Sequence, residues 1–234
     1  MNAMDRIIVA LDTPDPSVAG EMVQRLGPEL THFKTGLEFF CSGGPGAVEA
    51  LQDSGARLFL DLKLHDIPNT VAGAARSLAK LDVWMTNLHA SGGAEMMRAA
   101  REQLPDTILL AVTVLTSFDE KTFQEHVGTD ASVEDTVRRW SVSAREAGLD
   151  GVVCSPREIS TVRGELGDDF LIVTPGIRPQ WAAKGDQRRV TTPSEALQLG
   201  ADYLVVGRPI TGAPDPREAA GRIAREISEF EGSD

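Results

Sequence analysis

Short apolar runs alternate along the chain with stretches in which apolar residues recur every three or four positions. Runs such as Ile7-Ile8-Val9 predict buried strands, and the periodic stretches predict helices with one apolar face. The predicted strands span residues 6–11, 31–36, 57–64, 83–89, 107–115, 151–154, 170–174 and 203–206. The predicted helices span residues 15–26, 46–55, 68–81, 94–104, 133–147, 156–166, 192–199 and 216–230.

Each predicted strand is followed by a predicted helix, which is typical of a parallel sheet. Eight such units in 234 residues predict an α/β fold, a single-domain (β/α)8 TIM barrel spanning residues 1–234. An open, doubly wound sheet is the alternative. We favour the barrel because no Gly-x-Gly-x-x-Gly sequence follows the first strand, as it does in dinucleotide-binding sheets.

Polar residues gather where the predicted strands end. Because barrels of this class carry their active sites at the carboxyl ends of the strands, these residues are candidates for one common site. They are Asp12, Lys34, Asp61, Lys63, Asn87, His89, Thr116, Pro175, Gly207 and Arg208.

The run from Asp61 to Thr70, with the sequence Asp-Leu-Lys-Leu-His-Asp-Ile-Pro-Asn-Thr, ends the third strand. Residues two apart in a strand share a face, so Asp61 and Lys63 are expected to project to the same side. Pro68 suits the first turn of the next helix. Charged groups at a buried strand end are costly unless they pair or take part in chemistry, so a structural ion pair remains the alternative to a catalytic group.

Two connections are long enough to be binding loops, at residues 116–132 and 175–190. The second contains Pro175-Gly176-Ile177-Arg178 and Arg188-Arg189, and is basic within an acidic protein. Together with Gly207-Arg208 it predicts a phosphate site, since barrels often bind phosphate after strands seven and eight. A solvated basic loop is the alternative.

Charge and composition narrow the possible partners. The net charge of −12 argues against nonspecific binding to nucleic acid. No apolar run approaches the roughly 20 residues that a membrane span needs, and the first residues lack a signal-peptide core. Cys41 and Cys154 have no metal-ligand spacing, so we expect reduced cysteines in a cytoplasmic protein and no metal site.

These segments together resemble the orotidine 5'-monophosphate decarboxylase family, of the bacterial type. The signature positions are Asp12, Lys34, Asp61-Lys63-Asp66, Leu115-Thr116-Ser117, Pro175-Gly176-Ile177-Arg178, Gln187 and Gly207-Arg208, and they extend over residues 6 to 212. The resemblance implies a lyase of UMP biosynthesis, a cofactor-free carboxy-lyase that converts orotidine 5'-monophosphate to UMP and CO2. It also implies a homodimer with shared active sites.

The resemblance further implies roles for individual residues. Lys63 would donate a proton to C6 of the substrate, within a catalytic array of Lys34, Asp61, Lys63 and Asp66. Asp12 and Lys34 would bind the ribose hydroxyls. Gln187 would bridge base and phosphate, which Arg178 and Arg208 would hold. The expected substrate-binding set is Asp12, Lys34, Asp61, Ile67, Thr70, Thr116, Pro175, Arg178, Gln187, Gly207 and Arg208.

Three alternatives stay open. Relatives that decarboxylate 3-keto-gulonate 6-phosphate, or synthesise hexulose phosphate, share the Asp-x-Lys-x-x-Asp strand but need Mg²⁺; the continuation from His65 to Thr70 and Gln187 argue against them. A non-catalytic nucleotide-binding barrel would have no use for Lys63. Finally, Asp66 either reaches into a neighbouring subunit with Thr70, or caps the helix at Pro68 in its own subunit.

Overall fold

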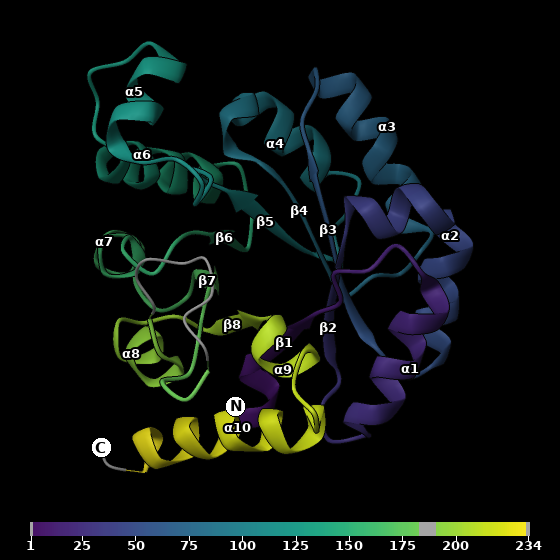
Figure 1. Cartoon of the computed structure of the whole chain (residues 1–234). Helices are drawn as coiled ribbons and strands as arrows, with labels where there is room; N and C mark the ends of the chain where they lie inside the picture. Colours follow the sequence, from purple (N-terminus) through teal and green to yellow (C-terminus); the bar gives the residue numbers. More distant parts are fainter. Residues whose placement is uncertain (1, 183–190, 233–234) are drawn as a thin grey trace.

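A computed structural model describes residues 2–182 and 191–232. In this part of the chain, eight parallel strands close into a barrel in the order β1 to β8, and the helices surround it (Figure 1). The strands are β1 Ile7–Ala10, β2 His32–Gly36, β3 Arg57–Leu64, β4 Met85–His89, β5 Ile108–Val112, β6 Gly151–Val153, β7 Leu171–Pro175 and β8 Tyr203–Val206. The predicted (β/α)8 barrel is therefore confirmed.

Ten α-helices and two short 3-10 helices lie within the described residues. The α-helices are α1 Pro16–Leu26, α2 Leu37–Asp53, α3 Pro68–Ala79, α4 Gly93–Arg101, α5 Glu120–Val127, α6 Val133–Glu146, α7 Ile159–Leu166, α8 Pro193–Gln198, α9 Arg208–Thr211 and α10 Pro216–Glu231. The 3-10 helices are η1 Ala3–Arg6 and η2 Ala90–Gly92. No helix in these residues is long and apolar enough to cross a membrane.

Side chains of the strands alternate between two apolar layers. Leu58, Leu60 and Leu62 of β3 pack outward beneath the helices, while Phe59 faces the barrel interior. The interior layer consists of Ile8, Ala10, Phe59, Met85, Leu110, Val173, Tyr203 and Val205. This layer fills the barrel, so that only its carboxyl-end rim is left for a site.

Three helices differ from the sequence prediction: the one-turn α9 was not predicted, and α2 and α5 also depart from it. The helix predicted at residues 46–55 is preceded by a further helical stretch from Leu37, and the two together form α2. They meet at a kink, where Gly44 (φ +59°) is not helical and Pro45 follows it. The connection predicted as a long loop at residues 116–132 contains α5, which stands at the outer edge of the molecule (Figure 1). Asp119 caps α5 by accepting from Thr122 N at 2.8 Å, and Gly128 ends it in the left-handed conformation.

Candidate active site

A cavity of about 340 Å³ opens at the carboxyl ends of the strands. It collects polar residues that the sequence predicted for a common site, although they come from seven different strands or the connections after them. The predicted residues that line it are Asp12, Lys34, Asp61, Lys63, Asn87, Thr116, Pro175, Arg178, Gly207 and Arg208.

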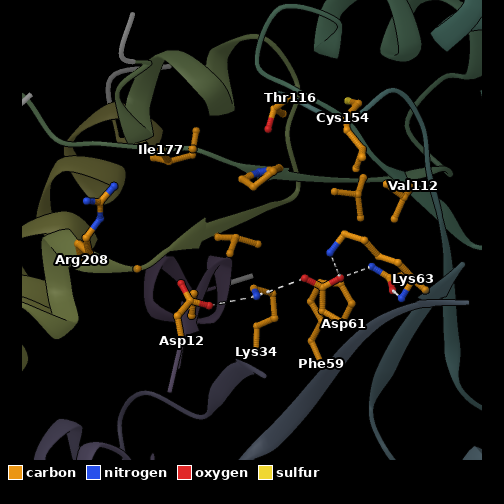
Figure 2. Close-up of a pocket in the computed structure, with 18 of the residues that line it drawn as sticks. Asp12, Lys34, Phe59, Asp61, Lys63, Val112, Thr116, Cys154, Ile177 and Arg208 are labelled. Carbon is orange, nitrogen blue, oxygen red and sulfur yellow. Dashed lines mark hydrogen bonds and ion pairs between the residues drawn. The ribbon is translucent and has the colours of Figure 1, made fainter. Parts of the chain in front are cut away.

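Four of these residues form a chain of alternating charge along one side of the cavity (Figure 2). Lys34 Nζ lies 3.5 Å from Asp12 Oδ1 and 3.2 Å from Asp61 Oδ2. Lys63 Nζ lies 2.6 Å from Asp61 Oδ1. The two ammonium groups and two carboxylates therefore balance in charge, which limits the cost of bringing them together at a partly buried strand end.

Asp61 stands at the centre of this charge array and is the most buried of the four residues. Its side chain is 11% exposed, whereas that of Asp12 is 72% exposed. Burial alone raises the pKa of a carboxyl, but Lys34, Lys63 and the hydrogen bonds from Lys63 and Asn87 outweigh it and hold the Asp61 pKa below its ordinary value. Asp61 is thus a stable carboxylate beside the Lys63 ammonium.

Two arginines, Arg178 and Arg208, also line the cavity. Figure 2 shows Arg208 at one end of the pocket and Lys63 at the other. Arg178 is buried after β7, and its backbone N donates to Thr191 O at 3.0 Å, which ties together the two ends of the connection that carries it. Arg178 and Arg208 are therefore candidates to bind an anion in the cavity, with Arg208 at the end away from Lys63 (Figure 2).

Apolar side chains cover much of the remaining cavity wall. Phe59, Val112, Val114, Cys154 and Ile177 line it, and the sequence analysis assigned them no role. Strand alternation was the only signal that could have pointed to them, and it does not distinguish a pocket wall from a barrel core. Burial raises the pKa of the Cys154 thiol well above its ordinary value, so Cys154 contributes an uncharged surface rather than a nucleophile.

Three residues predicted to act in catalysis or substrate binding do not line the cavity of their own subunit. Asp66, Ile67 and Thr70 are exposed, with Ile67 at 66%. The Asp66 carboxylate accepts from the next backbone N, of Ile67, at 2.6 Å, and no side chain caps the start of α3. The capping role considered for Asp66 is therefore not what this subunit shows.

A second cavity, of about 310 Å³, borders the charge array. It shares Asp12, Lys34, Asp61 and Lys63 with the first, and its other side is formed by residues 36–39 at the start of α2. The exposed side chain of Leu37 lies at its edge. The array is thus open on one side to whatever covers this surface.

Two histidines lie beside the array. The rings of His65 and His89 are 5.4 Å apart between centroids. Burial, then the nearby His65 and Lys63, lower the pKa of His89, which keeps its imidazole neutral near pH 7. Within residues 2–182 and 191–232, no three His, Cys, Asp or Glu side chains are grouped as metal ligands would be.

Two further residues complete the comparison with the sequence prediction. Gln187 lies outside the described residues. Asn87, which the sequence placed at the rim without a role, lines the cavity and donates from Nδ2 to Asp61 Oδ1 at 2.7 Å. Its signal was a polar residue within an otherwise buried strand.

Comparison with known proteins gives a consistent family. Residues 5–223 match the family model described as "Orotidine 5'-phosphate decarboxylase / HUMPS family". The orotidine 5'-phosphate decarboxylase of Moorella thermoacetica is 55% identical, over 97% of this chain and 94% of the relative. That of Alkalilimnicola ehrlichii is 53% identical, over 95% of this chain and 96% of the relative.

Solved structures extend the similarity to three dimensions. Orotidine 5'-phosphate decarboxylase from Lactobacillus acidophilus has a TM-score of 0.85 and 38% sequence identity, covering 94% of this chain and 98% of that chain. The Pyrococcus horikoshii enzyme of the same name has a TM-score of 0.77 and 26% identity, covering 95% and 99%. The similarity therefore includes the entire barrel and its rim.

Proposed function

The chain belongs to the orotidine 5'-phosphate decarboxylase / HUMPS family, and we propose that its rim cavity converts orotidine 5'-monophosphate to UMP and CO2. It is thus a carboxy-lyase of pyrimidine biosynthesis. The observation that carries this proposal is the Asp12–Lys34–Asp61–Lys63 array, held within one cavity that Arg178 and Arg208 also line. Arg208 and Lys63 lie at opposite ends of this cavity (Figure 2), an arrangement that suits a substrate with a reactive ring at one end and a phosphate at the other.

Lys63 is the catalytic acid in this proposal. The reaction breaks the bond between C6 and the carboxylate carbon, leaves the electron pair on C6 and releases CO2. The Lys63 ammonium stabilises the developing carbanion and transfers a proton from Nζ to C6, after which solvent reprotonates the amine. The contact between Lys63 and the Asp61 carboxylate supports this role, because it holds the ammonium group within the cavity.

The other cavity residues bind the substrate. Asp12 and Lys34 face the ribose hydroxyls, and Thr116 and Pro175 line the pocket for the base. Arg178, Arg208 and the Gly207 backbone hold the phosphate, with Gln187 bridging phosphate and base. The positions of Asp12, Lys34, Thr116, Pro175, Arg178, Gly207 and Arg208 around one cavity support this assignment.

The active form is a homodimer with shared sites. Asp66, Ile67 and Thr70 are exposed and line neither cavity of their own subunit, and the second cavity leaves the charge array open beside Leu37. In a two-fold dimer the same patch is used by both subunits. Asp66 of the partner subunit then completes the array, and Ile67 and Thr70 of the partner subunit cover the substrate.

We propose that the enzyme works in the cytoplasm. Its substrate is a small nucleotide, and it binds neither nucleic acid nor a membrane. Both cysteines are free thiols, with Cys41 exposed and Cys154 buried, as suits a reducing compartment. The acidic net charge of −12 disfavours binding to polyanions outside the phosphate site.

The decisive assay follows the ultraviolet absorbance of orotidine 5'-monophosphate, with and without a chelator. We expect equal loss of substrate in both conditions, with UMP as product. Activity that disappears with the chelator and returns with Mg²⁺ would indicate the metal-dependent sugar-phosphate chemistry of related barrels. Tight UMP binding without any turnover would indicate a nucleotide-binding protein instead.

A further inference from the structure

The β3 strand departs from regular pairing where it carries the charge array. Leu60 pairs with Thr86 and Leu64 pairs with Leu88, so three residues of β3 face the single β4 residue Asn87. Within this bulge Lys63 has φ +52°, in the left-handed region that non-glycine residues rarely occupy. Bulges of this kind re-aim side chains next to active sites, and the strain must be held by neighbouring contacts.

The Asn87 side chain supplies those contacts. Lys63 N donates to Asn87 Oδ1 at 2.8 Å, and Asn87 Nδ2 donates to Asp61 Oδ1 at 2.7 Å. Asn87 is 1% exposed, so water does not compete for either bond. A backbone N–H can only donate and a carboxylate can only accept, so a primary amide in this orientation satisfies both neighbours at once.

The contacts close into a ring. Asp61 Oδ1 also accepts from Lys63 Nζ at 2.6 Å. The same carboxylate oxygen therefore binds the Lys63 ammonium directly and the Lys63 backbone N–H through the Asn87 amide. Without Asn87, the Lys63 backbone N–H would lose its acceptor, and the Asp61 carboxylate would keep only its ion pairs with Lys34 and Lys63. The direction of the Lys63 side chain would then no longer be set by the bulge.

We propose that Asn87 is a positioning residue for the decarboxylation, because its amide locks the Lys63 backbone to the Asp61 carboxylate and thereby aims the Lys63 ammonium at the reacting carbon. This inference rests on the proposed function. The competing view is that Asn87 only satisfies two buried polar groups. That view predicts a loss of stability without a specific loss of turnover in the molecules that remain folded.

Thr86 offers a matched control on the same strand. It is fully buried and its hydroxyl donates to Leu60 O of β3 at 2.8 Å, but it does not line the cavity. Thr86→Val therefore removes a buried side chain–backbone bond between the same two strands while leaving the array intact. It reports what loss of such a bond does to stability alone.

The experiment compares Asn87→Ala, Asn87→Asp and Thr86→Val with the unmodified enzyme, measuring kcat and KM for orotidine 5'-monophosphate, UMP affinity and Tm. We expect kcat to fall by about 100-fold in both Asn87 variants, the scale of loss for a misaimed group, with UMP affinity held within about threefold. Thr86→Val should keep kcat within about twofold. Asn87→Asp is nearly isosteric and keeps the test available if Asn87→Ala does not fold.

A pH profile of kcat for Asn87→Asp tests whether the group at position 87 acts on Asp61. The second carboxylate in Asn87→Asp disfavours ionisation beside Asp61, so the acidic limb of kcat should move to higher pH. Folded Asn87 variants that retain kcat, or lose no more of it than Thr86→Val, would overturn the positioning role. Absence of decarboxylation by the unmodified enzyme would instead overturn the proposed function.

Discussion

Lys63 combines a side chain that we propose to be catalytic with a backbone conformation that lysine rarely adopts. Its φ of +52° allows Asp61 and Lys63 to meet although three residues of β3 face one residue of β4. Strain of this kind persists at functional sites because the surrounding contacts enforce it. The residue is thus held in place by its backbone as well as by its ion pair.

The backbone strain at position 63 can be measured by comparing two variants that both lack the ammonium group. Lys63→Gly and Lys63→Ala both remove the amine, but only glycine tolerates the left-handed region freely. We expect the glycine variant to have the larger free energy of unfolding, by roughly 1 kcal/mol, in urea denaturation. Equal stabilities, or a more stable alanine variant, would show that the bulge relaxes when the lysine is removed.

At the level of elements, acidic residues tie the start of one strand to its neighbours. Asp202, just before β8, accepts from Arg163 of α7 at 2.7 Å and from Ile172 N of β7 at 2.8 Å. Asp150, just before β6, makes the corresponding bonds to Arg101 and Leu109 N. These ion pairs and hydrogen bonds lie at the opposite end of the barrel from the cavity, where they contribute to stability.

Loss of one of these aspartates should lower the stability of the protein and leave its activity unchanged. Asp202→Ala leaves the Arg163 guanidinium and the Ile172 N–H without their shared acceptor, so we expect the free energy of unfolding to fall by about 1–3 kcal/mol. Glu165→Ala is the control, since its pair with Arg138 is exposed and should change stability by about 0.5 kcal/mol or less. Equal losses in urea titrations would contradict this ranking.

In the proposed function, Arg178 after β7 and Arg208 after β8 hold the substrate phosphate. Arg208→Ala should lower kcat/KM by at least about 100-fold, although Arg208 lies at the opposite end of the pocket from Lys63 (Figure 2), because binding energy at the phosphate organises the catalytic end. Phosphite added to a substrate lacking its phosphate should partly restore turnover in the unmodified enzyme. Failure of phosphite to accelerate the truncated substrate would refute this coupling.

The sequence predicted the barrel because apolar strands and amphipathic helices leave clear periodic signals, as in Ile7–Val9. It predicted the rim residues because strand ends follow from the same pattern. It did not predict α5, although Asp119 and Gly128 mark its two ends, because the connection was read as a loop from its length. The role of Asn87 could not be predicted, since a bulge depends on the pairing register of two strands, which alternation within one strand does not reveal.

At the scale of the whole molecule, a single barrel holds most of the site but leaves the charge array open at the second cavity. In the proposed shared-site dimer, Asp66 of the partner subunit would close it. An isologous interface around Leu37 and Ile67 would also cover two of the exposed large apolar side chains in the described residues.

Subunit mixing tests this assembly. Lys63→Ala and Asp66→Ala are each expected to be inactive, but a mixed dimer has one site with both lesions and one with neither. Random exchange of equal amounts makes about half of the dimers mixed, so roughly a quarter of native activity should return. If exchange is confirmed by mass measurement and the mixture stays inactive, both residues serve the site of their own subunit.

The most direct test of the account is the rate of orotidine 5'-monophosphate decarboxylation by Lys63→Ala, with UMP affinity measured on the same preparation. If Lys63 is the proton donor, kcat should fall by about 100- to 10,000-fold, the contribution of a positioned general acid, while UMP binding changes little. A variant that binds UMP normally and keeps about a tenth or more of the native rate would contradict the assignment of Lys63 as the catalytic acid.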